Sequence, residues 1–194
     1  MAGRPKIFDE NVVVEKATSV FLDKCYDATS ADELLAAMGI GKGSFYLAFQ
    51  GGKQELYQRS LQQFSDRFSG KLETAIANAP NGIDVIKSYF YAIAEGNKAT
   101  KYRGCYLGNA LVQLSEKDNS TREIAARLLG RLQEIFTAAV RKAQAAGQLK
   151  TTADPELIGL HLCNFWNGIH VTKRMGKSPK ALRALVDLNL QILS

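Results

Sequence analysis

The sequence contains few of the residues that build metal sites and disulfide frameworks. Its 194 residues include only two histidines and three cysteines, which are Cys25, Cys105 and Cys163. No Cys-x-x-Cys pair occurs, and the three cysteines lie far apart in the chain. This pattern argues against a zinc site or a disulfide framework and suits a reducing compartment. We therefore expect neither a metal nor a cofactor.

Long apolar runs are also absent. The first ten residues, MAGRPKIFDE, lack the apolar stretch of a secretory signal, and no apolar run approaches the length of a membrane span. We expect a cytoplasmic protein without a membrane partner. Apolar and polar residues do not alternate as they do in strands, and glycines and prolines fall between segments of helical periodicity. The sequence therefore predicts an all-α protein.

The N-terminal end lacks an excess of charge of one sign. The formal net charge of the chain is +6, yet residues 1–53 contain six basic and seven acidic residues. From Arg141 onward the chain has eight basic and three acidic residues. A broad cationic field is thus no argument for a nucleic-acid partner. Such an argument must rest on the placement of individual residues.

Apolar periodicity and capping signals predict about nine helices. The expected segments are Asp9 to about Lys24–Tyr26, Thr29 or Ser30 to Met38, 42–49, 53–78, 83–98, 105–115, 119–146, 154–175 and 179–193. Asp154-Pro155 and Ser178-Pro179 each have an N-cap residue followed by proline at the first helical position. We expect a small N-terminal head, residues 1–52, and a larger C-terminal bundle, residues 53–194.

Residues 38–49, MGIGKGSFYLAF, are compatible with two kinds of loop. A nucleotide-binding P-loop needs an adjacent lysine and hydroxyl after a buried strand, whereas Gly43 here separates Lys42 from Ser44. In the alternative, Gly39 ends one short helix in the left-handed conformation, Ile40 fills the turn, and a second short helix follows. The pattern favours this helix-turn-helix.

The same stretch resembles the N-terminal signature of the TetR family of transcriptional regulators. The resemblance covers roughly residues 8–61, and the residues that carry it are Thr29-Ser30, Leu34, Ala37, Gly39-Ile40, Lys42-Gly43-Ser44-Phe45-Tyr46, Phe49 and Lys53. Residues 153–190 are also similar to the last two helices of many members. The resemblance implies a regulator that binds double-stranded DNA, most often as a repressor.

The placement of these residues indicates which of them meet DNA. Gly43 and Ser44 let the second short helix approach the major groove closely, and the Tyr46 hydroxyl can reach a phosphate. Thr29 and Lys53 lie at the starts of flanking helices, where N–H groups suit anions. With a basic arm suited to the minor groove, the predicted DNA-binding residues are Arg4, Lys6, Thr29, Lys42, Gly43, Ser44, Tyr46 and Lys53. Alternatively, Tyr46 only packs and the arm contacts nothing.

The sequence departs from the family pattern in three places. Gly41 stands where a serine or threonine usually caps the recognition helix, which costs about 1 kcal/mol of capping. Leu47 and Ala48 occupy positions that often carry polar side chains, so contacts expected there are missing. The loop 50–52 is one residue longer than the commonest spacing before the lysine, which leaves the phosphate partner of Lys53 open.

The resemblance implies a homodimer in which the last two helices of each subunit form a four-helix bundle. The segment 179–193 supports this independently, because its seven large aliphatic residues make it too apolar for a helix that buries only one face. A two-fold dimer would present two recognition helices to an operator with dyad symmetry. We take the dimerisation residues to be Leu182, Leu185, Val186 and Ile192.

Family members generally bind a small molecule in the C-terminal domain and then release DNA. The residues expected at such a site, for an apolar or aromatic molecule, are Phe68, Tyr89, Tyr106, Asn109, Phe165 and Trp166. Aromatic residues at helical spacing are, however, more often plain core.

Cys105 is the predicted redox-sensing residue. Lys101 and Arg103 precede it, and it opens a helix whose N-terminal dipole favours a thiolate. A Gly-Cys pair at this place resembles one branch of the TetR family, some of whose members respond to reactive compounds. The alternative is a small buried cysteine that only packs.

Two other classes of function stay open. One is a helical adaptor that binds a protein and uses the helix-turn-helix only as a scaffold. The other is an enzyme, although the sequence shows no nucleophile–base pair, metal cluster or cofactor loop. We expect a regulator rather than an enzyme.

Overall fold

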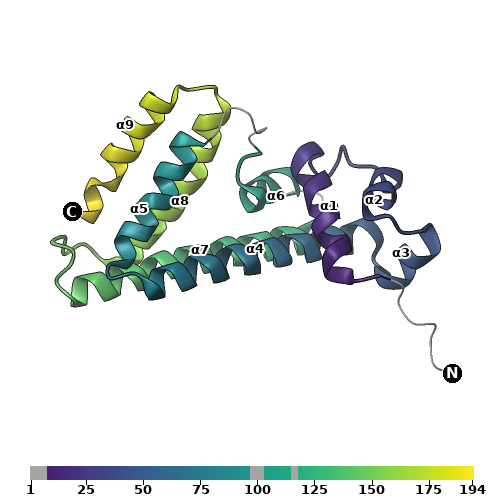
Figure 1. Cartoon of the computed structure of the whole chain (residues 1–194), viewed down its shortest axis with the longest axis horizontal. Helices are drawn as coiled ribbons and strands as arrows, with labels where there is room; N and C mark the ends of the chain where they lie inside the picture. The colour runs from purple at the N-terminus through teal and green to yellow at the C-terminus, as the bar shows by residue number, and fades with distance from the viewer. Residues whose placement is uncertain (1–7, 97–102, 115–117) are drawn as a thin grey trace. The chain divides into compact units, whose positions relative to one another are not determined.

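The structure, a computed structural model, describes residues 8–96, 103–114 and 118–194 (Figure 1). Within these ranges it contains nine α-helices and no strand, which confirms the all-α prediction. The helices are α1 (Glu10–Lys24), α2 (Ala31–Met38), α3 (Lys42–Ala48), α4 (Gly52–Asn78), α5 (Gly82–Glu95), α6 (Tyr106–Leu114), α7 (Asn119–Ala145), α8 (Pro155–Arg174) and α9 (Pro179–Asn189), followed by a 3-10 turn, Leu190–Leu193. Among the described residues, no helix combines the length and apolarity needed to span a membrane.

Side-chain caps start several helices where the sequence predicts them. Asp9 accepts a hydrogen bond from the Asn11 N–H at 2.8 Å and begins α1. Ser30 and Glu33 form a reciprocal capping box at the start of α2. Asp154 and Ser178 cap α8 and α9, each followed by proline at the first helical position. Each such cap contributes about 1 kcal/mol, so these starts are set locally.

The chain divides into two compact units. The first consists of Met1–Arg67 and Asn109–Ala126, and the second of Phe68–Gly108 and Arg127–Ser194. This division differs from the expected boundary at residues 52 and 53, because the start of α4 packs on the head. The Tyr57 ring of α4 lies 4.8 Å from the Phe21 ring of α1.

The core of the first unit holds the three short N-terminal helices in place. It consists of buried side chains from α1 to α4: Val13, Val14, Ala17, Phe21, Leu34, Met38, Phe45, Phe49, Leu56, Tyr57 and Leu61. Burying each large apolar side chain stabilises the fold by about 1.5–3 kcal/mol. On the surface of this unit, Arg67 of α4 forms an ion pair with Glu15 of α1. The orientation of α2 and α3 therefore rests on packing.

In the second unit, α5 lies against α8 and α9 (Figure 1). The Phe90 ring of α5 stacks on the Phe165 ring of α8 at 5.0 Å, and Trp166 and His170 follow along the same helix with ring centroids 4.9 Å apart. Burial and the nearby Lys173 lower the pKa of His170 to about 4. The imidazole is therefore neutral at pH 7 and belongs to the apolar core.

Candidate nucleic-acid interface

The turn between α2 and α3 has the geometry that its glycines predict. Gly39 ends α2 in the left-handed conformation, with φ of 71°, and its N–H donates to the Leu35 carbonyl at 2.9 Å. A side chain would strain this position. Ile40 is half-buried in the turn. Gly41 begins α3 in an extended conformation and has no side chain with which to cap it. The helix-turn-helix and the uncapped start of α3 are thus confirmed.

Two buried aromatic residues decide which side of α3 faces outward. Phe45 is 3% exposed and Phe49, just after the last turn, is 0% exposed. Because an α-helix advances by about 100° per residue, the direction opposite these rings is occupied by Gly43 and Leu47. The exposed residues Ser44 and Tyr46 flank this pair, and Lys42, which is also exposed, is the first residue of the helix. We call the exposed residues Lys42, Gly43, Ser44, Tyr46 and Leu47 the recognition face.

Gly43 stands at the centre of the recognition face without any structural need for glycine. A Cβ placed on Gly43 would meet no atom within 4 Å, and its φ is not positive. Glycine inside a helix costs about 1 kcal/mol relative to alanine. A bare backbone at this point instead suits a large partner that approaches closely, as in a helix lying in the DNA major groove.

Tyr46 and Lys53 each combine packing with exposure. The Tyr46 ring lies edge-on to the Phe45 ring at 5.1 Å, yet 49% of the residue is exposed. Lys53, in the first turn of α4, places its Nζ 4.3 Å from the centroid of the Tyr26 ring. Burial lowers the pKa of Lys53, and the nearby Asp27 opposes that shift. Packing therefore holds the Tyr46 ring on α3 and the Lys53 side chain at the start of α4 in defined positions.

Thr29 is placed differently from the other predicted DNA-binding residues. Its side chain is only 2% exposed, and its hydroxyl donates to the Cys25 carbonyl at 2.6 Å. Ser30, and not Thr29, caps α2. The Thr29 hydroxyl thus serves the loop between α1 and α2, and we leave it out of the recognition face. Arg4 and Lys6 lie outside the described residues.

Comparison with known families agrees with this geometry. Residues 13–59 match the family model described as bacterial regulatory proteins, tetR family. Residues 82–188, more than half of the chain, match the model of the tetracyclin repressor-like C-terminal domain. The chain belongs to the TetR family. It is accordingly a DNA-binding transcriptional regulator.

Similar proteins span nearly the whole of this TetR-family chain. The HTH-type transcriptional repressor DhaR of Mycobacterium sp. (strain GP1) is 26% identical over 182 residues, which cover 93% of this chain and 90% of DhaR. The HTH-type transcriptional repressor ComR of Escherichia coli (strain K12) is 26% identical over 197 residues, with coverage of 98% and 91%. The fold is shared with a cysteine mutant of CifR in complex with operator DNA, at a TM-score of 0.83, 22% identity and coverage of 98% and 100%.

The predicted ligand-binding residues of this regulator lie mainly in one aromatic cluster. The Phe68 ring is 5.8 Å from the Tyr89 ring and 5.3 Å from the Trp166 ring. Phe165 stacks on the neighbouring Phe90, so the cluster is part of the core of the second unit. Tyr106, also assigned to the second unit, is 2% exposed. Asn109 is half-buried and is assigned to the first unit, although it follows Tyr106 by three residues on α6.

Next to this cluster lies a polar group that the sequence did not reveal. The Asn167 Nδ2 group donates to the Cys163 carbonyl at 3.0 Å. Its Oδ1 atom is buried and has no hydrogen-bond partner within the part of the chain that the structure describes. A Cβ on Gly108 would lie 2.7 Å from that oxygen. The sequence pattern does not distinguish this asparagine from any other in an amphipathic helix. Only the tertiary structure therefore identifies its oxygen as an unsatisfied acceptor.

The surroundings of Cys105 favour the thiol over the predicted thiolate. Burial raises its pKa, although its Sγ accepts a hydrogen bond from the Gly108 N–H at 3.3 Å. Burial therefore opposes the thiolate expected at the helix N-terminus, because desolvation of a charged sulfur outweighs the hydrogen bonds it receives. Whether Cys105 is a sensor stays a prediction.

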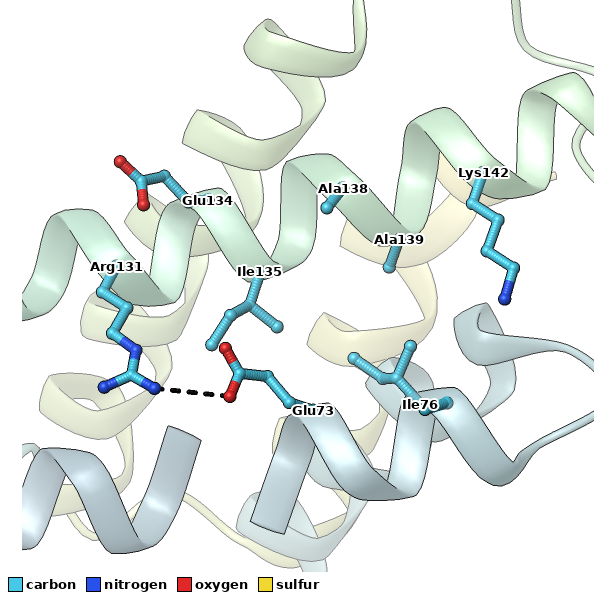
Figure 2. Close-up of a pocket in the computed structure, with 9 residues that line it drawn as sticks. Glu73, Ile76, Arg131, Glu134, Ile135, Ala138, Ala139 and Lys142 are labelled. Carbon is cyan, nitrogen blue, oxygen red and sulfur yellow. Dashed lines mark hydrogen bonds and ion pairs between the residues drawn. The ribbon is translucent and has the colours of Figure 1, made fainter. Parts of the chain in front are cut away.

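A groove in the second unit also escaped the sequence analysis. It has a volume of about 530 Å³ and lies between α4 and α7, with Ile76, Ile135, Ala138 and Ala139 among its lining (Figure 2). At its edge Arg131 faces Glu73 at 3.3 Å (Figure 2). None of the predicted ligand-binding residues lines it. Small aliphatic residues at helical spacing are typical of any amphipathic helix and gave no signal.

The predicted dimerisation residues point mainly inward. Leu182 and Val186 are 2% and 0% exposed in the core of the second unit, and Leu185 and Ile192 pack against that core. Leu182 and Val186 thus cover their own subunit, and the part that the four residues take in an interface stays a prediction. A different set of large apolar residues is 51–66% exposed on α8 and α9; this α8–α9 apolar face consists of Leu157, Leu160, Val171, Met175 and Leu188.

The first prediction concerns Gly43. The substitution Gly43→Ala should raise the free energy of unfolding by about 0.5–1 kcal/mol, because alanine is the better helix former. The added Cβ should also keep α3 from approaching the major groove closely. Because the loss of a good base contact costs about 1–3 kcal/mol, specific DNA binding should weaken about tenfold or more. Urea unfolding and fluorescence anisotropy with labelled duplex measure the two effects.

Gly130→Ala in α7 is the matched control, because a Cβ there also meets no atom within 4 Å. It should stabilise the protein without changing affinity for DNA. Wild-type affinity in Gly43→Ala would contradict a role of the bare backbone at the interface.

Proposed function

We propose that the protein is a repressor that binds a pseudo-palindromic operator as a homodimer. It releases the operator when a small apolar or aromatic molecule binds, or when Cys105 is modified. The observation that carries the proposal is the recognition face of α3, which holds a bare backbone at its centre. The relatives DhaR and ComR are repressors, which supports regulation rather than catalysis and a cytoplasmic site of action.

The α8–α9 apolar face supports the homodimer. On α8 and at its C-cap, Leu157, Leu160, Val171 and Met175 recur at spacings that keep them on one side of the helix. Several large apolar residues exposed on one side of a helix suit an interaction site. A second copy of the chain would bury the same face in a two-fold arrangement. Two recognition faces would then address two half-sites, which is why we propose a pseudo-palindromic operator.

The aromatic cluster with Asn167 supports a small-molecule site. A buried acceptor without a hydrogen-bond partner costs about 1–3 kcal/mol. A ligand with an apolar or aromatic body and one N–H or O–H group would remove that cost by donating to the Asn167 Oδ1 atom. Its ring would contact Trp166, which precedes Asn167 in α8. We propose this cluster, rather than the open groove of Figure 2, as the inducer site.

The second prediction tests DNA binding itself. The protein should shift the DNA upstream of its own gene, and its affinity should fall steeply as salt rises, because bound counterions are released. Lys53→Ala should weaken binding to every sequence about equally and reduce the salt slope by about one, as expected for a phosphate contact. Lys150→Ala, at an exposed lysine of the second unit, is the control and should change neither. Unchanged affinity and slope in Lys53→Ala would refute the phosphate contact.

The third prediction concerns the homodimer. Wild type should be a dimer at micromolar concentration by light scattering, and Leu160→Glu or Leu188→Glu should be folded monomers that bind the operator weakly. Their positions are exposed in the subunit, so circular dichroism should be unchanged. Val186→Glu should instead unfold the protein, because it buries an unpaired charge.

Val112→Glu is the matched control, because Val112 is 81% exposed but lies on α6. This variant should remain dimeric. A monomeric wild type, or dimers of both glutamate variants on the α8–α9 apolar face, would refute the proposed interface.

The fourth prediction concerns Cys105. Treatment with a quinone should release operator from wild type but not from Cys105→Ser. Because burial raises the pKa of the Cys105 thiol, the reactive thiolate is scarce at neutral pH. Its fraction, and with it the release rate, should therefore rise about tenfold per pH unit below that pKa. Equal release from both proteins, or none from either, would assign control to the aromatic cluster alone.

A further inference from the structure

We propose that Leu47 recognises the C5 methyl group of a thymine in each half-site of the operator. The inference rests on the proposed function, namely specific DNA binding through the recognition face. It goes further by assigning one side chain to one atom of one base. Leu47 thereby becomes a specificity-determining residue at a position where the sequence pattern predicted a lost contact.

The exposure of Leu47 is the first observation. The side chain is 72% exposed, although leucine is among the residues most often buried. Five of the other exposed large apolar residues belong to the α8–α9 apolar face, where the proposed second copy of the chain would cover them. Leu47 lies on α3 in the first unit and has no part in that face.

The position of Leu47 on the helix is the second observation. It lies opposite the buried rings of Phe45 and Phe49, four residues after Gly43. Side chains in an α-helix lean toward the N-terminus, so a leucine covers the surface one turn earlier. The surface one turn earlier is Gly43, which has no side chain and open space around it. A base edge can therefore approach the Leu47 methyl groups without a clash from the preceding turn.

The chemistry of the major groove then selects the base. Leucine has no donor or acceptor, so it cannot bind a phosphate oxygen or the polar edges of guanine, cytosine and adenine. Burying it against those edges would leave their polar atoms without partners. Thymine alone among the four bases presents an apolar methyl group in the major groove. Leu47 is complementary to that group.

The expected effect follows from the area of one methyl group. Burial of one such group changes a binding constant by about fourfold at 25 °C. Two symmetric half-sites should together give about fifteenfold. The same loss of affinity should result from removing the methyl group from the DNA or the side chain from the protein. The two changes together should weaken binding no more than either change alone.

The experiment is a deoxyuridine scan, because deoxyuridine differs from thymidine only by the absent C5 methyl group. The probe is the duplex that the wild-type protein selects from a random-sequence pool, with each thymine replaced in turn in both half-sites. Affinities are measured by anisotropy for wild type, Leu47→Ala and the control Val112→Ala, an exposed valine on α6. Circular dichroism checks that Leu47→Ala, an exposed position, keeps its helices.

For wild type and Val112→Ala, one thymine position should show a loss of about fifteenfold. Leu47→Ala should bind the unmodified duplex about that much more weakly and show no loss at that position. The proposal is overturned if no replacement weakens wild type, or if the loss persists unchanged in Leu47→Ala. If wild type selects no duplex, the proposed function fails as well, whereas specific binding without a methyl effect removes only the role of Leu47.

Discussion

The burial of Phe45 and Phe49 is the interaction on which the DNA-binding surface depends. Helix α3 is only seven residues long and begins at a glycine that offers no cap. A helix of this length is unstable in isolation, because nucleation is costly and few hydrogen bonds follow. The two rings hold α3 on the core of the first unit and fix its rotation. That rotation alone decides that Gly43 and Leu47 face outward.

The outward face of α3 carries residues that weaken the helix. The glycine and the uncapped start are each unfavourable for a protein that has no partner. Such conflicts between local preference and structure are expected where function imposes its own requirement. Here the common requirement is close, partly apolar contact with a duplex. Lys53 lies at the start of α4, where it packs on the Tyr26 ring. It therefore supplies positive charge at the edge of the DNA-binding surface rather than at its centre.

The second unit shows the same division between inner and outer faces on a larger scale. Helix α9 buries Leu182 and Val186 against its own subunit and leaves Leu188 exposed. Its buried residues thus belong to the subunit core, and its exposed Leu188 is available to the proposed dimer. The core that contains the aromatic cluster favours uncharged groups. Burial lowers the pKa of the His170 imidazole and raises the pKa of the Cys105 thiol, and each shift favours the neutral form. A neutral ligand suits such surroundings.

The sequence by itself determined where helices begin and end and to which family the chain belongs. The caps at Asp9 and Ser30 and the stop at Gly39 depend on hydrogen bonds between residues at most four positions apart, so local spacing suffices to predict them. Only the tertiary structure decided that Thr29 is buried, that Leu182 faces inward, that burial favours the Cys105 thiol and that the Asn167 oxygen lacks a described partner. These properties depend on burial by residues remote in sequence, and periodicity reports that a face is apolar without saying what covers it.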